Sequence, residues 1–273
     1  METPVNPVNE AEAAPTPPPE TAPAPLLTKF RAVIQGGSKR GNNNAIFTTN
    51  DLRGLVEVAA TFSDKITFFV DADGVKVRVL DSAKIALLDA MLPRSVFVAF
   101  DADGVGHVAV DAKSLLVALR RAKSKGAELK YEDGQLVLTI AGVRSFRVRA
   151  LEASVEAAPQ PKVNHTASAI VDADLFKEAL VDARVMKADA VKLLAENGVL
   201  LFRAVNETKE VEVKLAPAEG EAASTYALDY LMKAAKAFGD GVVEVKFGNN
   251  TPLELATAFN EGYVKVFIAP RVE

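Results

Sequence analysis

The feature that most constrains this chain is a supersecondary pattern that runs through the sequence twice. From residue 30 onward, runs typical of strands and helices follow the order strand, helix, strands, helix, strands, and the same order then returns. The matches that carry the repeat are Asp51-Leu52 with Asp174-Leu175, the turn signal Asp73-Gly74 with Asn197-Gly198, and Lys130 with Lys246. Turn signals of this kind join neighbouring antiparallel strands. The sequence therefore predicts two consecutive domains of one design.

Hydrophobic periodicity gives the individual elements. Four segments have apolar residues at helical spacing: 51–62, the segment from Asp111 to Ala122, the segment that opens at Asp174, and 226–238. Asn50 or Asp51 is expected to cap the first of these helices. Strands are expected at 30–35, 66–70, 75–80, 85–92, 96–100, 128–132, 136–140, from about 144, and at 190–196, 199–205, 210–215, 242–247, 253–259 and 263–268.

Two helices in each half are too few to cover both faces of a sheet. We therefore expect an α+β fold of two tandem pseudo-repeated domains, with the helices on one face of antiparallel sheets. Composition sets the limits: a Pro/Ala/Glu-rich tail at 1–26, a first domain at 27–150, a connecting linker at 151–163 and a second domain at 164–273. Proline removes backbone donors and fixes φ, so the tail is predicted to be disordered.

Composition also excludes several classes of protein. The chain has no cysteine and only two histidines, which excludes a disulfide scaffold, an iron–sulfur cluster, a thiol nucleophile and a multi-histidine metal site. No apolar run is long enough to span a bilayer, and the N-terminus lacks a secretory signal. We expect a soluble cytoplasmic protein with no membrane partner, no metal and no cofactor.

The sequence offers no convincing catalytic site. Gly104-x-Gly106 matches a dinucleotide fingerprint by letters, but the residues after it are expected to be extended and not helical. Paired aspartates fall at expected turns, where aspartate serves local hydrogen bonding. His107 and His165 lack an obvious catalytic partner and are expected at the surface. No catalytic residue is predicted, and the chain is not expected to be an enzyme.

Charge is distributed unevenly. The net charge is −4, but the tail holds four glutamates and no base, so the rest of the chain is neutral. Basic side chains gather off the apolar stripes of the expected helices, and the second helix has no acid between Ala112 and Lys125. One basic helix face is usually just solvated. Three of them in one repeated chain favour a surface that faces phosphates.

With these features in place, the sequence resembles the sliding clamps of the proliferating cell nuclear antigen (PCNA) family in their archaeal form. The resemblance rests on residues 74–93, on Tyr226-Ala-Leu-Asp-Tyr-Leu, on the hairpin Phe247-Gly-Asn-Asn-Thr-Pro-Leu-Glu-Leu and on the ending Ala269-Pro270-Arg271. It extends from about residue 28 to residue 273. The sequence departs from the family pattern in an apparent insertion at 36–44, in a linker poor in large aliphatic residues and in the few bases of the first helix.

The resemblance implies a three-subunit ring around duplex DNA, bound without sequence preference. Such a ring is a processivity factor for DNA replication and repair, associated with the nucleoid when loaded. Its implied partners are DNA polymerase, a clamp loader, and clients of the flap nuclease and ligase type. The implied DNA-facing residues are Arg53, Lys113, Arg120, Arg121, Lys177, Arg184, Lys187, Lys233 and Lys236. The implied pocket for partner peptides consists of Leu80, Lys84, Leu87, Pro161, Pro252, Phe267, Ile268 and Ala269.

Two strongly alternating segments, 143–151 and 210–215, are the expected subunit edges. Their outward charges are opposite in sign: Arg144, Arg147 and Arg149 on one edge, and Glu210 and Glu212 on the other. This complementarity favours ring closure. The sequence leaves open a homotrimer, a heterotrimer with paralogous clamp subunits, and a clamp-fold interaction subunit that does not encircle DNA alone.

Overall fold

The structure, a computed structural model, describes residues 27, 29–36, 47–123, 125–152, 161–239, 241–259 and 261–271. The predicted tail at 1–26, nearly all of the apparent insertion at 36–44, and linker residues 153–160 lie outside this described part. The fold is α+β, with strands far outnumbering helices.

Each half of the chain contains two α-helices and a series of antiparallel strands. The first half consists of β1 (Phe30–Ile34), α1 (Thr49–Phe62), β2 (Lys65–Asp71), β3 (Gly74–Leu80), β4 (Ala86–Pro93), the short 3-10 helix η1 (Arg94–Val96), β5 (Ala99–Ala102), β6 (Gly106–Asp111), α2 (Ala112–Arg120), β7 (Ala127–Glu132), β8 (Gln135–Ile140) and β9 (Arg144–Leu151). The second half consists of β10 (Ala167–Asp172), α3 (Ala173–Val185), β11 (Ala190–Glu196), β12 (Val199–Val205), β13 (Glu210–Gly220), β14 (Ala222–Ala227), α4 (Leu228–Ala234), the short 3-10 helix η2 (Ala235–Ala237), β15 (Val242–Phe247), β16 (Leu253–Phe259) and β17 (Gly262–Ile268).

Strand pairing confirms the repeat. β1 pairs with β5 and β7, and β2 with β6; in the second half β10 pairs with β13 and β15, and β11 with β14. The predicted alignment of the two hairpins is shifted by one residue. The first turn is Ala72-Asp73, and not Asp73-Gly74, whereas the second is Asn197-Gly198 as predicted. The domain limits themselves remain predictions.

One strand pair joins the two halves into a continuous sheet. β17, the last strand of the chain, pairs antiparallel with β4, from Tyr263 opposite Met91 to Ile268 opposite Ala86. We call this pairing the internal junction. The last strand of the first half, β9, has no such partner from the second half among the described residues.

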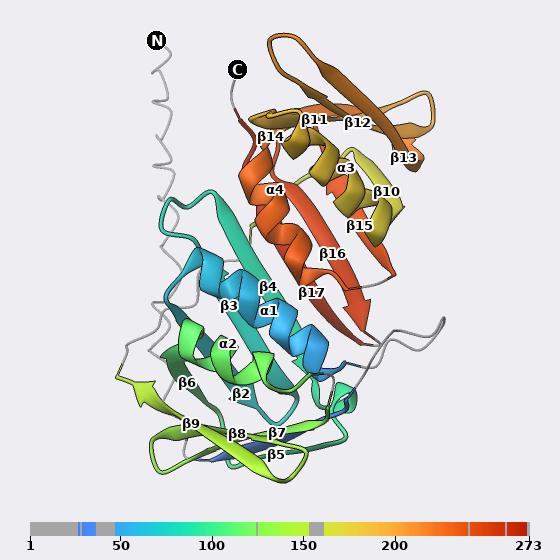
Figure 1. Cartoon of the computed structure of the whole chain (residues 1–273). Helices are drawn as coiled ribbons and strands as arrows, with labels where there is room; N and C mark the ends of the chain where they lie inside the picture. Colours follow the sequence, from blue (N-terminus) through green and yellow to red (C-terminus); the bar gives the residue numbers. More distant parts are fainter. Residues whose placement is uncertain are drawn as a thin grey trace, which may run out of the picture.

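All four helices lie on one side of the strands (Figure 1), as the sequence predicts. α1 packs beside α2, α3 beside α4, and η2 against α1 across the two halves. A Cβ atom on Gly54 of α1 would lie 2.9 Å from the carbonyl oxygen of Lys236, so glycine permits this close approach. The core between helices and strands contains the buried residues Leu55, Leu115, Phe176 and Leu231, one from each helix.

Several local predictions need correction. Thr48, not Asn50 or Asp51, caps α1, and it exchanges hydrogen bonds with Asp51 in a capping box. Residues 96–98 form no strand, because η1 precedes β5. Tyr226 lies in β14, so the last helix begins two residues later than predicted. His107 is wrongly expected at the surface: it is the second residue of β6, lies opposite Phe69 and is 3% exposed.

No helix among the described residues is long and apolar enough to cross a membrane. The same part of the chain has no cluster of three or more histidine or acidic side chains suited to a metal ion.

Candidate nucleic-acid and partner interfaces

The predicted DNA-facing residues of the first half lie on α1 and α2, and three of them are near acids. The ammonium of Lys113 lies 2.6 Å from the Asp64 carboxylate, which raises the pKa of Lys113. The guanidinium of Arg120 lies 3.5 Å from the carboxylate of Glu57 on α1. Arg53 is half-buried one turn before Glu57, and Arg121, the C-cap of α2, is exposed with no ion pair to a described residue.

The bases of the second half lie on α3, α4 and η2. Lys177 contacts Asp174 at 3.2 Å and donates to the Gly239 carbonyl at 3.1 Å. The ammonium of Lys233 lies 4.7 Å from the ring centroid of Tyr230. The remaining three predicted bases of this half are exposed with no ion pair to a described residue: Arg184, Lys187 and Lys236. The helix layer therefore brings the predicted set together on one side of the molecule. Four members form no ion pair with a described residue, and we call them the uncompensated bases: Arg121, Arg184, Lys187 and Lys236.

The centre of the predicted peptide pocket lies at the internal junction. Leu87 on β4 is directly opposite Phe267 on β17, and each is 4% exposed. Their strand neighbours Leu88 and Val266 belong to the core beneath the helices. Because side chains alternate along a strand, Leu87 and Phe267 lie on the sheet face away from the helices. Ile268, also predicted for the pocket, is fully buried on the core side.

The other predicted pocket residues surround this pair. Leu80, at the end of β3, is 39% exposed, and Lys84 is exposed in the following turn with a left-handed φ of 58°. The amide of Ala269 donates to the carbonyl of Ile85 at 2.8 Å, which ties the end of β17 to that turn. Pro161 and Pro252 are half-buried. Asp81 lies within the 74–93 segment that carries the family resemblance, but sequence reasoning gave it no role at the site; the structure shows that the turn is organised around its buried side chain.

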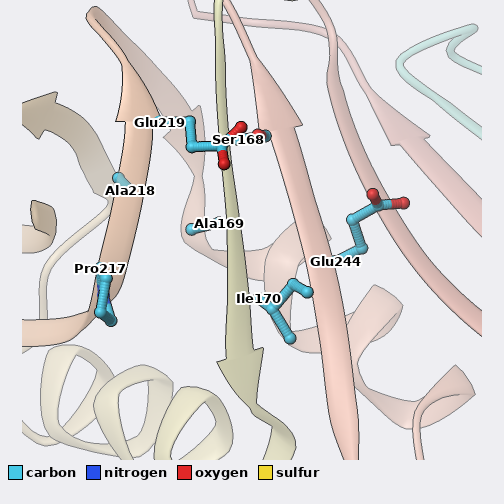
Figure 2. Close-up of a pocket in the computed structure, with 7 residues that line it drawn as sticks. All are labelled: Ser168, Ala169, Ile170, Pro217, Ala218, Glu219 and Glu244. Carbon is cyan, nitrogen blue, oxygen red and sulfur yellow. The ribbon is translucent and has the colours of Figure 1, made fainter. Parts of the chain in front are cut away.

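Two surface grooves lie elsewhere. The larger, of about 470 Å³, runs between β10 and β13, and Figure 2 shows Pro217, Ala218 and Glu219 on β13 across from Ser168 and Ile170 on β10. The smaller, of about 220 Å³, lies beside Phe69 and Val105. Neither groove is lined by a residue predicted for DNA, peptide or subunit contact. Among the described residues, the lining of the larger groove includes two carboxylates, those of Glu219 and Glu244.

The two predicted subunit edges lie at opposite ends of the molecule (Figure 1). β9 pairs with β8 along its length but with β6 only at Ala150 and Leu151. β13 pairs with β12 but reaches β10 only at residues 218–220. Within the described part of the chain, residues 144–149 and 210–217 therefore each leave one side of a strand unpaired.

The charged side chains on the two edges differ in whether they have an ion-pair partner. Arg144, Arg147 and Arg149 are exposed and form no ion pair with a described residue. In contrast, Arg203 on β12 holds both glutamates of β13, with its Nε 3.2 Å from Glu210 and 3.0 Å from Glu212. The hydrogen bond and charge of Glu212 raise the pKa of Arg203. Among the described residues, the arginines of the basic edge have no acidic partner, whereas the glutamates of the acidic edge are compensated by Arg203 of the same chain.

No family model matches the chain. A DNA polymerase sliding clamp of Thermococcus sibiricus is 32% identical over 235 residues, which cover 80% of this chain and 94% of the relative. A DNA polymerase sliding clamp of Pyrococcus horikoshii is 30% identical over 234 residues, with the same coverage of both chains.

Solved structures have the same fold. PCNA from Thermococcus kodakaraensis superposes with a TM-score of 0.78 at 24% identity, over 89% of this chain and 100% of the other. A PCNA2–PCNA3 complex from Sulfolobus tokodaii gives 0.78 at 22% identity over 89% and 100%. A. fulgidus PCNA with the C-terminal region of FEN-1 bound gives 0.77 at 20% identity over 89% and 99%. With its repeated α+β halves, one-sided helices and 32% identity over nearly the full length of a relative, the chain belongs to the DNA polymerase sliding clamp family.

Proposed function

We propose that this protein is a processivity factor: three copies close into a ring around duplex DNA and hold a DNA polymerase and other replication and repair enzymes on their template. The protein contributes no catalysis of its own. It acts in the cytoplasm, at the nucleoid when loaded. The single observation that best supports the proposal is the internal junction between β17 and β4. The repeat provides an equivalent of each of these strands, β9 and β13, and these equivalents can pair between subunits as β17 and β4 pair within the chain.

The repeat makes β13 the counterpart of β4. Arg78 on β3 is opposite Asp89 on β4, and Arg203 on β12 is opposite Glu212 on β13. Two residues along, Leu80 is opposite Leu87, and Val205 is opposite Glu210. Glu210 therefore occupies the position that Leu87 has at the internal junction.

The repeat also makes β9 the counterpart of β17. Lys130 and Lys246 are the matched residues of β7 and β15, and opposite them lie Val137 on β8 and Glu254 on β16. Val137 lies opposite Arg147 on β9, and Glu254 lies opposite Phe267 on β17. Arg147 thus corresponds to Phe267.

These equivalences predict the register between subunits. If β9 of one copy meets β13 of the next as β17 meets β4, Arg147 lies directly opposite Glu210, with Glu212 on the diagonal. Arg149 corresponds to Ala269 and lies past the end of the paired glutamates. Phe146 and Val148 of β9 and Val211 and Val213 of β13 would then extend one continuous core, which supports closure through these edges.

The helix layer supports the placement of DNA. A clamp must hold the duplex and still slide, so it needs diffuse attraction to phosphates and no hydrogen bonds to base edges. The uncompensated bases Arg121, Arg184, Lys187 and Lys236 supply such attraction. In a ring built by repeating the internal junction, the helices of all the domains share one side, and we place the DNA there.

Partner binding is proposed at the apolar pair of the internal junction. Leu87 and Phe267 lie on the face away from the helices, where a partner does not compete with DNA. A peptide that inserts an aliphatic or aromatic residue would contact them together with Leu80 and Pro252. FEN-1, whose C-terminal region is bound to A. fulgidus PCNA, represents the flap nuclease class of client. A clamp loader and a ligase are further proposed partners.

Light scattering after size exclusion tests ring closure. A homotrimer has three times the 29.0 kDa mass of one chain. A monomer that joins a ring only when paralogous clamp subunits are added supports the heteromeric alternative. A monomer under all conditions contradicts the ring.

The DNA face is tested by neutralising Arg121, Arg184 and Lys236 to alanine. Loading onto DNA and stimulation of a polymerase should fall, most clearly at low salt, and should depend less steeply on salt than in wild type, while the mass of the assembly stays unchanged. The matched control neutralises Lys76, Lys130 and Lys192, which lie on strands at positions that alternate away from the core. Equal losses in both triple variants would contradict the assignment of the helix layer to DNA.

A further inference from the structure

The turn between β3 and β4 is organised around one buried carboxylate. Asp81 is 6% exposed, and its Oδ1 accepts hydrogen bonds from the amides of Ile85 at 2.6 Å and Ala86 at 2.8 Å. Its Oδ2 accepts from the amide of Ala83 at 3.3 Å. The Asp81 amide in turn donates to the Ala86 carbonyl at 2.9 Å. The conformation of residues 81–86 thus depends on this side chain.

A fourth donor reaches Asp81 from the other half of the chain. The hydroxyl of Tyr230, on α4, donates to Oδ2 at 2.8 Å across 149 residues of sequence. Burial by itself would raise the pKa of the Asp81 carboxyl, but the hydrogen bonds from Ala86, Tyr230, Ile85 and Ala83 outweigh burial and lower it. The same bond raises the pKa of Tyr230 to about 12. At neutral pH the contact is therefore a neutral phenol donating to a carboxylate, a strong class of hydrogen bond.

This turn contributes to the proposed peptide pocket. Lys84 is exposed at its tip, and the Ile85 carbonyl accepts from the amide of Ala269. Leu80 precedes the turn and Leu87 follows it. On its other side, the Tyr230 ring lies beneath the ammonium of Lys233, a predicted DNA-facing base. One tyrosine therefore contacts both the helix layer and the turn beside the pocket.

We infer that Tyr230 is a positioning residue for partner binding: its hydroxyl fixes the 81–86 turn, and with it the pocket beside Leu87, against helix α4. The inference rests on the proposed function of that pocket. Tyr230 does not itself touch the peptide. Its loss should loosen the pocket wall while the sheet and the subunit edges remain as they are.

Tyr263 provides a matched control. Its hydroxyl also donates to an aspartate of the first half, Asp89, at 3.3 Å, but it does so within the internal junction and away from the turn. Tyr230→Phe and Tyr263→Phe each remove one hydroxyl and one tyrosine–aspartate bond between the halves. Only the first change releases Asp81.

The test compares the full-length variants by affinity for a synthetic peptide of the A. fulgidus FEN-1 C-terminal region and by amide hydrogen exchange. Tyr230→Phe should bind the peptide roughly three- to tenfold more weakly, and Tyr263→Phe within about twofold of wild type. Exchange at the Ile85 and Ala86 amides should accelerate in Tyr230→Phe only. This exchange measurement needs no ligand, so it tests the positioning role even if the peptide does not bind.

A cycle with Asp81→Asn tests whether Tyr230 acts through Asp81. The double variant should lose no more affinity than Asp81→Asn alone, because the two residues form one interaction. Unchanged exchange at Ile85 and Ala86 in Tyr230→Phe, or equal effects of the two tyrosine variants, would overturn the inference. Failure of the pocket itself is distinguishable: the peptide would then bind Phe267→Ala as tightly as wild type, whatever Tyr230 does.

Discussion

The internal junction and the two open edges are built from repeat-equivalent strands, yet they have opposite chemistry at equivalent positions. Where Leu87 faces Phe267 inside the chain, the free edges present Glu210 and Arg147. An apolar pair suits a permanent junction, and it is beside this pair that we propose a partner binds. A charged pair suits an edge that must stay soluble until it meets its partner, since charge on an exposed strand discourages promiscuous pairing. Under the proposed function, one design would thus serve both as a recognition site and as a subunit contact.

The two equivalent ion pairs show the same contrast. Arg78 lies 2.8 Å from Asp89, and Asp89 is 3% exposed because β17 covers it. Arg203 holds Glu212 in the same way, but this pair is exposed on the open edge. If the edges close as proposed, Glu212 should become as buried as Asp89. The internal junction therefore serves as the template for the subunit contact that we propose.

The largest expected effect comes from removing the apolar pair. Phe267→Ala should weaken binding of the FEN-1 peptide by about 2 kcal/mol or more, roughly thirtyfold, because it removes an aromatic wall. Stability should also fall, by about 3 kcal/mol, since the side chain is buried. Isothermal titration calorimetry measures the first effect and urea unfolding the second. Phe267→Leu keeps most of the apolar volume, so its peptide affinity and its stability should lie between those of wild type and Phe267→Ala. A folded Phe267→Ala protein with wild-type affinity would place the pocket elsewhere.

The two ion pairs should respond unequally to loss of the arginine. Arg78→Gln removes the guanidinium that lies 2.8 Å from the buried Asp89 carboxylate and should cost about 1–3 kcal/mol of unfolding free energy. Arg203→Gln leaves Glu212 in solvent and should cost much less. Urea unfolding of the isolated chains measures the loss of unfolding free energy in each of the two variants. Equal losses would mean that the junction does not bury its pair more effectively than the open edge.

The predicted register should be visible in the assembly. Arg147→Glu places like charges opposite Glu210 and should weaken subunit association about tenfold, by about 1.4 kcal/mol. Arg149→Glu should have a smaller effect, because no glutamate lies directly opposite it. Sedimentation at a series of protein concentrations gives the association constant of each variant. Recovery in an Arg147→Glu, Glu210→Lys double variant would support the pairing, whereas a larger effect at Arg149 would shift the register.

The smallest expected effect is a pH dependence near the junction. Burial lowers the pKa of His165, Glu254 at 4.0 Å raises it, Lys246 and Lys265 lower it, and the result is below the usual 6.5. The unfolded chain therefore binds this proton more readily than the folded chain, so stability is full above about pH 6.5 and falls as pH drops through the folded pKa. His165→Gln should flatten this slope slightly, as followed by thermal unfolding from pH 7.5 to pH 5.5. An identical slope in the variant would exclude His165 as its source.

Much of the fold was accessible from the sequence because its signals are local. The periodicity of 51–62 and the aspartate before Ala112 predict α1 and α2 closely. The start of the last helix was predicted wrongly because local sequence does not distinguish the two possibilities. An aromatic residue at 226 fits either a strand or the start of a helix, and only the strand pairing with β11 decides between them. His107 lies opposite Phe69 on β2, with the two ring centroids 6.1 Å apart, and its carbonyl accepts a hydrogen bond from the amide of Leu27. Neither neighbour is close to His107 in the sequence.

The candidate sites were less accessible. Basic helix faces and alternating edges can be found from spacing, and the pocket residues came from family resemblance. The pairing of β17 with β4 joins segments more than 170 residues apart and leaves no local trace. The same holds for the bond from Tyr230 to Asp81, and for Arg203, whose compensation of Glu210 and Glu212 depends on the register of β12 against β13.

The central claim is that the protein encircles DNA, and topology tests this claim most directly. Protein loaded by its clamp loader onto a closed circular duplex should remain bound through gel filtration. A single cut by a restriction enzyme should then release it, because a ring slides off a free end and a conventional DNA-binding protein does not. Retention on the linear product equal to that on the circle would contradict the account.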